Sequence, residues 1–396
     1  MLEKLVMEFS KINLKLVNFW APSMQDVYQK PDYLNVVIRK CEASWLSIPL
    51  IRPYITSNNP KGRASLDVLL IRMTDDQGNI GWGEACPSWG GYSPETPESG
   101  WQSLKSFLPS LIGVDGVMRS RMIKQKFEDF PFVLSAINEC VVEIGGDPLL
   151  TAPTKSFGFE LAATVNTLDV AEAVEMAKKY VEDGYKTLKV KVGIEARTDA
   201  IRATKIFEAV KGKAKLRVDA NRRFGIDAAY EFATNVPIEA IEYFEQPYES
   251  SNWEAIEALA KRSPIPLMLD ESIYGPDDIE RAAKTGCAKA VKLKMSKVGG
   301  PTVLREQIEF ARGLGLDVVV GNGVATDFAC YREALCCSRS GVTTAGEMNG
   351  FLKLIAPILE EPIKMVGPNM VIPAGTSPRL RADALTKFAI HQANYS

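Results

Sequence analysis

Short apolar segments alternate with longer amphipathic segments from residue 159 onward. The short segments are rich in β-branched and aromatic residues and are bounded by Gly, Pro, Asn or Asp, which predicts strands at residues 159–165, 185–192, 215–219, 240–245, 265–270, 290–294, 316–321 and 343–347. Residues 169–184 have helical spacing and end in Gly184, and residues 301–315 begin with Pro301. Such alternation predicts an α/β fold, a (β/α) barrel of seven or eight units.

The ends of the predicted strands carry polar residues at intervals of one strand–helix unit. Lys191 is followed after 28, 26, 25, 24, 28 and 25 residues by Asp219, Glu245, Asp270, Lys294, Asn322 and Glu347. In such a barrel all strands open at their carboxyl ends on one face, where active sites are built. Three acids from neighbouring strands, with a lysine on each side, are therefore expected to converge there.

The three acids Asp219, Glu245 and Asp270 predict a metal site. Carboxylates that close together in a partly buried mouth repel one another, and a divalent cation removes the repulsion. Oxygen ligands favour a hard ion, Mg²⁺ most simply, with Mn²⁺ as an alternative. A single Asp at a strand end is often only a helix cap, but caps do not explain three acids after three apolar segments.

Lysines occur in pairs on two of these strands. Lys189 and Lys191 in TLKVKVG, and Lys292 and Lys294 in VKLKMSKVGG, lie two residues apart and so on one face of a strand. Burial beside another cation or a metal can lower the pKa of a lysine until neutral amine is available as a base. We therefore expect Lys191 and Lys294 to flank a substrate carboxylate, with Lys189 beneath Lys191. A surface role suits Lys186 and Lys297 better.

Composition excludes several classes of chemistry. The formal net charge is −2 in 396 residues, which offers no electrostatic case for nucleic acid. The seven scattered cysteines form no CxxC pair and predict a reducing cytoplasm. No apolar segment predicts a membrane span or a signal peptide. The one histidine, His391, makes a Ser-His-Asp triad or a His-rich zinc site implausible, so carboxylates, lysines or tyrosines must act as acid and base.

Taken together, these motifs resemble the muconate-lactonizing branch of the enolase superfamily. LKVKVG resembles its KxK strand, RVDAN, YFEQP and LDESI its three metal-ligand strands, and VKLKMSKVGG its sixth strand. The segment from Asn35 resembles an α+β capping domain, in which DDQG at 75–78 independently predicts a hairpin turn. The resemblance implies a cap over 35–150, a barrel over 151–358 and a C-terminal segment, 359–396, that returns to the cap. Residues 1–34 are an extension without a counterpart.

The resemblance also implies roles for individual residues. Asp219, Glu245 and Asp270 would be Mg²⁺ ligands, Lys191 and Lys294 the acid–base pair, and Lys189 the helper of the first base. Asn221 and Glu271 would lie just behind the ligands. Substrate contacts are expected from the cap loops and from the last strands: Tyr54, Thr56, Ser57, Trp89, Gly90, Gly91, Tyr92, Asn322, Thr326, Glu347 and Asn349.

Two departures from the family pattern limit the substrate. Ala325 stands where the racemases and o-succinylbenzoate synthases of the branch have a glutamate, and GEMNG lacks the Asp-x-Asp with which dipeptide epimerases hold an ammonium group. We therefore expect a racemase, epimerase or dehydratase that abstracts a proton α to the carboxylate of an amino acid or a small acid, through a metal-stabilised enediolate. An o-succinylbenzoate synthase or muconate-type cycloisomerase is the alternative, and a non-catalytic barrel or a Schiff-base aldolase the alternative from another class. Resemblance also implies a homo-oligomer.

Overall fold

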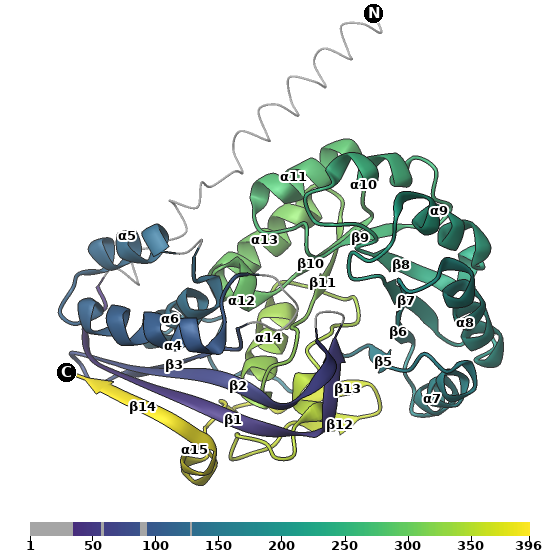
Figure 1. Ribbon diagram of the computed structural model, residues 1–396. Coiled ribbons are helices and arrows are strands. Elements are labelled where there is room, and N and C mark those ends of the chain that lie inside the picture. The colour runs from purple at the N-terminus through teal and green to yellow at the C-terminus, as the bar shows by residue number, and fades with distance from the viewer. Residues whose placement is uncertain (1–34, 57–58, 88–92, 127–128) are drawn as a thin grey trace, which may run out of the picture.

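A computed structural model describes residues 35–56, 59–87, 93–126 and 129–396, and it contains an antiparallel and a parallel sheet (Figure 1). The antiparallel part comprises β1 (Ile38–Thr56), β2 (Asn59–Asp75), β3 (Ile80–Ala85) and the helices α4 (Pro97–Phe107), η1 (Leu108–Leu111), α5 (Gly116–Lys126) and α6 (Pro131–Ile144). The sheet has the order β14-β1-β2-β3, so the C-terminal strand β14 (Ala389–Tyr395) joins it beside β1. The predicted turn at 75–78 connects β2 with β3.

The second half of the chain forms a curled parallel sheet in the order β11-β10-β9-β8-β7-β6-β5. Its strands are β5 (Ala163–Val165), β6 (Thr187–Lys191), β7 (Lys215–Asp219), β8 (Ile241–Glu245), β9 (Leu267–Leu269), β10 (Ala290–Leu293) and β11 (Asp317–Val320). The intervening helices are α7 (Val170–Glu182), α8 (Ala196–Ala209), α9 (Ile226–Asn235), η2 (Ile238–Ala240), α10 (Trp253–Ala260), α11 (Pro276–Thr285), α12 (Met295–Val298) and α13 (Pro301–Gly313). The helices α7 to α11 and α13 lie outside the curl, whereas α12 lies toward α6 (Figure 1). This half is consistent with an α/β barrel.

The first and last predicted strands of the barrel differ from expectation. Residues 159–165 do not form one strand: β4 (Phe157–Glu160) pairs with β13 (Asn369–Ile372) in a separate sheet, and only β5 joins the parallel sheet. Residues 343–347 form no strand, and Gly346 and Glu347 make only single parallel bridges, to Leu161 and Gly321.

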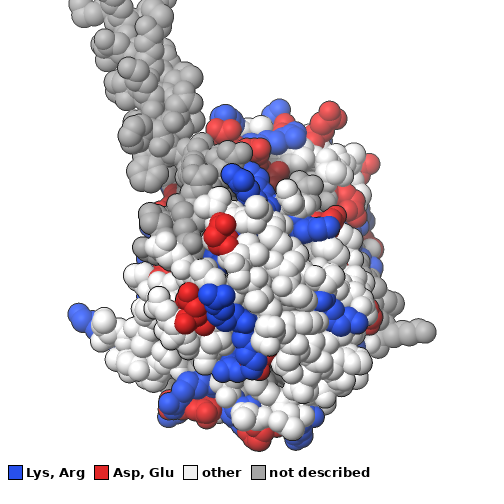
Figure 2. Space-filling view, turned by 90° about the vertical axis from the view of Figure 1, so that its left-hand side faces the viewer, with Lys and Arg blue, Asp and Glu red and all other residues white. Residues whose placement is uncertain are grey.

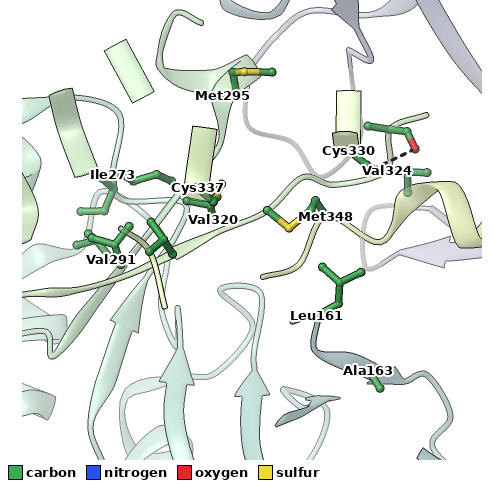
Figure 3. Packing of buried hydrophobic residues seen from close by; sticks show 14 of the residues in the cluster. Leu161, Ala163, Ile273, Val291, Met295, Val320, Val324, Cys330, Cys337 and Met348 are labelled. Atoms are coloured by element: carbon green, nitrogen blue, oxygen red, sulfur yellow. Dashed lines mark hydrogen bonds between the residues drawn. The ribbon is translucent and has the colours of Figure 1, made fainter. Parts of the chain in front are cut away.

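Alternation along each parallel strand explains the paired lysines. Leu188 and Val190 of β6 belong to the large core cluster packed beneath the outer helices, so Lys189 and Lys191 face the inside of the curl. Tyr243, Met268, Ala290 and Val319 form a small apolar cluster from β8 to β11. Figure 3 shows part of the large cluster, where Leu161, Val320 and Met348 come from segments far apart in sequence.

The C-terminal region divides between a small third sheet and the four-stranded antiparallel sheet. After α14 (Asp327–Arg339) and η3 (Gly350–Lys353), β12 (Lys364–Val366) pairs with β13 (Asn369–Ile372), and β13 pairs with β4. The chain then continues through α15 (Ala382–Phe388) to β14.

Hydrogen bonds join the antiparallel part to the parallel part. Arg332 of α14 is buried and donates to the carbonyl of Trp82 at 2.6 Å and also bonds Glu143 of α6. Asn138 of α6 donates to the carbonyl of Gly299 at 2.9 Å. On the face in Figure 2, basic and acidic side chains are interspersed. No helix among the described residues is long and apolar enough to cross a bilayer.

Two glycines allow β3 to lie directly against α6. A Cβ on Gly83 would lie 1.9 Å from the carbonyl oxygen of Ala136, and one on Gly81 would lie 2.1 Å from that of Cys140. We expect Gly83→Ala to lower the free energy of unfolding by about 3 kcal/mol, because backbone cannot move as a flexible side chain can. Chemical denaturation of the wild type and the variant measures this difference in the free energy of unfolding. The matched control Gly313→Ala, where nothing lies within 4 Å, should be neutral, and equal losses would refute the packing argument.

Candidate active site

Three acidic residues mark the carboxyl ends of adjacent parallel strands. Lys191 pairs with Asp219, and Asp219 with Glu245, in the register of β6, β7 and β8. Asp270 follows β9, which pairs with β8. All three acids are at most 1% exposed. The spacing argument therefore placed these residues correctly on one edge of the sheet.

The inner lysines bridge the carboxylates. Lys189 Nζ lies 2.8 Å from Asp219 Oδ2 and 2.7 Å from Glu245 Oε2. Lys292 Nζ lies 3.0 Å from Glu245 Oε1 and 3.7 Å from Asp270 Oδ2. Each inner lysine thus connects two neighbouring strand ends.

Glu347 holds both inner lysines from the other side. Its Oε2 lies 2.7 Å from Lys189 Nζ and also bonds Lys292 Nζ, and its Oε1 accepts from Arg217 Nη1 at 2.7 Å. Arg217 is fully buried and also lies 3.1 Å from Glu242. Of the two roles considered for Glu347, substrate contact and orientation of neighbouring groups, these contacts favour orientation.

The outer lysines lie at the mouth of the curl. Lys191 Nζ bonds Asp219 Oδ2 at 2.6 Å and Asn221 Oδ1 at 2.7 Å, and its side chain is 33% exposed. Lys294, just after β10, bonds both carboxylate oxygens of Asp270. The expectation that Lys297 is a surface residue was wrong: Lys297 is 1% exposed and donates to the carbonyl of Asp270 at 2.7 Å. Lys297 lies within the short helix α12, which turns it inward, whereas Lys186 is exposed as expected.

Burial and mutual charge shift the pKa values in opposite directions. Burial favours the neutral form of Asp219, but Lys189 and Lys191 outweigh it and hold the pKa of Asp219 below its ordinary value. Burial likewise opposes ionisation of Glu347, yet Lys189, Lys292 and Arg217 lower its pKa well below the ordinary value. The pKa of Lys189 is raised because three carboxylates outweigh its burial. Burial lowers the pKa of Lys294 to about 7, against the opposing effect of Asp270.

Backbone strain accompanies the loops after two of the acids. Asn221 and Arg222 have φ angles of 43° and 68°, and Gln246 has 38°. Non-glycine residues rarely occupy this left-handed region, and each costs about 1–3 kcal/mol unless its surroundings hold it. Asn221 also donates to Glu271 Oε1 at 3.3 Å, and the Gln246 side chain accepts from the backbone N–H of Asp270 at 3.0 Å. The strained residues thus position the neighbouring acids.

The acidic residues suit a hard cation by their chemistry. Three buried carboxylates on successive strand ends supply the oxygen ligands that Mg²⁺ prefers. In the present arrangement each carboxylate is bonded to lysine. Across the described ranges, no three His, Cys, Asp or Glu side chains converge as a metal-binding group. The donor chemistry of Asp219, Glu245 and Asp270 therefore fits the cation.

A cavity opens beside Lys294 between the cap and the barrel. Its lining includes Glu84 of β3, Glu139 of α6, and Lys294, Asn322, Ala325 and Glu333 from the barrel. Asn322 Nδ2 donates to Glu333 Oε2 at 2.6 Å. Thr326 does not line the cavity: its N–H donates to Glu84 Oε1 at 2.9 Å, and it begins α14.

The other expected substrate contacts fall into two groups. Asn349 Nδ2 donates to the Ala162 carbonyl at 3.3 Å, and Lys353 Nζ donates to Asn349 Oδ1 at 2.7 Å. Lys353 also lies 5.6 Å from the Tyr54 ring centre, which connects Tyr54 with Asn349 through that lysine. Trp89, its neighbours Gly90, Gly91 and Tyr92, Ser57 and the Thr56 side chain lie outside the described residues.

Comparison with known proteins decides the family. The model "Enolase C-terminal domain-like" matches residues 172–376, just over half of the chain. The chain belongs to the enolase superfamily. It is 26% identical to muconate cycloisomerase 1 of Rhodococcus opacus, covering 86% of this chain and 95% of that one. It is also 26% identical to the L-Ala-D/L-Glu epimerase of Clostridium acetobutylicum, covering 72% and 82%.

A solved structure agrees with this superfamily fold. The N-succinyl Arg/Lys racemase of Bacillus cereus superposes with a TM-score of 0.81 at 21% identity, covering 91% of this chain and all of that one. At this identity the likeness concerns the fold alone. The matched relatives are isomerases, and the protein is an enolase-superfamily enzyme of this type. Enzymes of this group generally use Mg²⁺.

Sequence reasoning missed four residues near the site. Glu84, Glu139 and Glu333 line the cavity, and Lys353 approaches Tyr54. Glu139 and Glu333 lie on helices, so the strand-end rule cannot find them. Their signal in the sequence is an acidic residue on the apolar face of a helix, in INECVV and YREALCC.

Proposed function

We propose that this superfamily enzyme abstracts a proton α to the carboxylate of an amino acid or related small acid, in a Mg²⁺-dependent racemisation, epimerisation or dehydration. One observation carries the proposal: two lysine pairs face each other across three strand-end acids. The pairs are Lys189/Lys191 and Lys292/Lys294. β6 and β10 are separated by β7, β8 and β9, so the outer lysines approach the mouth from two sides. The bridges of Gly346 and Glu347 support a closed barrel.

The lysines would divide the work by position. Lys191 or Lys294, as a neutral amine, takes the α-proton, while the electron pair of the broken C–H bond stays on the substrate. The opposite lysine, protonated, returns a proton to the other face or assists a β-substituent to leave. Asp219, Glu245 and Asp270 would hold the cation, and Mg²⁺ when bound supplies positive charge that acidifies the α-proton. Lys189 and Lys292 are engaged with Glu245 and Glu347, so their role is to hold these acids in place.

A muconate-type cycloisomerase is the second candidate. It is favoured by the match to muconate cycloisomerase 1, which covers 95% of that enzyme. Cycloisomerisation uses the same proton transfer at the carbon next to a carboxylate, and so it requires the same lysines. The two candidates differ only in the acid that the cavity accepts.

Deuterium uptake tests the proposal. The protein is incubated in D₂O with a panel of amino acids, N-acyl amino acids and muconate, with Mg²⁺ or with EDTA, and α-deuterium is followed by NMR. We expect uptake from at least one acid with Mg²⁺ and its loss with EDTA, restored by added Mg²⁺, because three carboxylates alone cannot acidify the α-proton. Uptake that persists in EDTA, or a protein that neither exchanges any acid nor binds Mg²⁺, would refute the mechanism.

A further inference from the structure

The cavity beside Lys294 is lined by acids that the proposed proton transfer does not use. Glu84 and Glu139 come from the cap, and Glu333 comes from α14. Each is at most 3% exposed. Lys294 lines the same cavity, whose open volume of about 20 Å³ suits one small terminal group of a substrate seated between the outer lysines.

The three acids differ in how fully they are bonded. Both oxygens of Glu84 are engaged, by the N–H and hydroxyl of Thr326 and by Cys86. Glu139 has one long contact, 3.4 Å from Arg332 Nη1. Glu333 accepts from Asn322 through Oε2, and its other oxygen, Oε1, has no partner among the described residues. Asn322 Oδ1, also on this cavity, is buried and has no partner within the described ranges.

This cavity therefore offers hydrogen-bond acceptors in excess of donors. Lys294, its one lysine, is already bonded to both oxygens of Asp270. Burial, aided by the Glu84 carboxylate, raises the pKa of Glu333 to about 8 despite the lowering effects of Asn322 and Lys294. A buried acid without a counter-ion gains when a cation binds beside it, since the pair replaces lost hydration.

We propose that Glu333, with Asn322, is a specificity-determining pair that receives an ammonium group carried at the far end of the substrate. The substrate class is then a carboxylic acid with a cationic side chain or terminal amine. An ammonium group has three N–H donors and no acceptor, which suits Glu333 Oε1 and Asn322 Oδ1. This inference rests on the proposed function for the position of the substrate, since the reacting carbon must lie between Lys191 and Lys294.

Matched acids test the pair. Calorimetry with Mg²⁺ measures the binding of ω-amino acids of increasing length and of fatty acids of the same lengths. The proteins compared are the wild type, Glu333→Gln and the exposed control Glu254→Gln. Deuterium uptake is measured with Nα-acetyl-lysine and N-acetyl-norleucine. We expect the amino compound of the best length to bind at least about tenfold more tightly than its partner, and Glu333→Gln alone to remove that preference. Raising the pH from 7 to 9 should strengthen the wild-type preference for the amino compound.

The outcomes separate this inference from the proposed function. Preferential binding that depends on Glu333, without any deuterium uptake, would support the subsite and refute the proton abstraction. Deuterium uptake that is equal or faster with N-acetyl-norleucine would support the abstraction and overturn the subsite. A preference for amino compounds that survives Glu333→Gln would also overturn the subsite. Circular dichroism tests whether the variant is folded.

Discussion

Replacing either outer lysine should slow α-deuterium uptake by roughly 10²- to 10⁴-fold, the usual contribution of a positioned acid or base. Lys191→Met and Lys294→Met keep most of the side-chain length and remove the amine. Because the two lysines reach the mouth from β6 and from the end of β10, we expect each variant to lose exchange mainly from one enantiomer of the substrate. NMR of each pure enantiomer in D₂O, with Mg²⁺, measures both rates.

Two controls make this result specific. Lys186→Met removes an exposed lysine that directly precedes β6 and should leave both rates unchanged. Calorimetric Mg²⁺ binding by each variant shows whether the acids still hold the cation. If Lys191→Met or Lys294→Met binds Mg²⁺ and exchanges both enantiomers at the wild-type rate, that lysine is not a base.

Replacing Glu347 should cause a large loss of stability. Glu347→Leu would leave Lys189, Lys292 and Arg217 without the carboxylate that joins them, and all three are at most 5% exposed. Removing one partner of a buried ion pair costs about 3–5 kcal/mol, because the remaining charge is buried and uncompensated. Urea denaturation monitored by tryptophan fluorescence measures the difference in unfolding free energy.

A matched surface pair gives the comparison. Arg197 and Glu231 lie 2.6 Å apart with side chains 78% and 38% exposed, so Glu231→Leu should change stability little. The double variant Glu347→Leu with Arg217→Met should recover part of the loss, since one unpaired cation is then gone. Equal losses at Glu347 and Glu231, or no recovery in the double variant, would show that Glu347 does not neutralise the inner lysines.

The candidate site could be read from the sequence largely because its residues follow a rule of position. Asp219, Glu245, Asp270 and the outer lysines end successive parallel strands, and such ends meet on one edge. Period-two alternation also placed Lys189 on the same face as Lys191. By contrast, Lys297 was wrongly expected on the surface, because its orientation depends on the short helix α12 and not on a strand period.

The sequence by itself determined the α/β alternation, the family and the strand-end acids and lysines, because these depend on local period and spacing. Only the tertiary structure decided that Glu347 joins Lys189, Lys292 and Arg217, and that Glu333 reaches the cavity beside Lys294. It also decided that β4 leaves the parallel sheet for β13. These contacts join residues at least 55 positions apart or lie on helix faces, where local pattern carries no information about the partner.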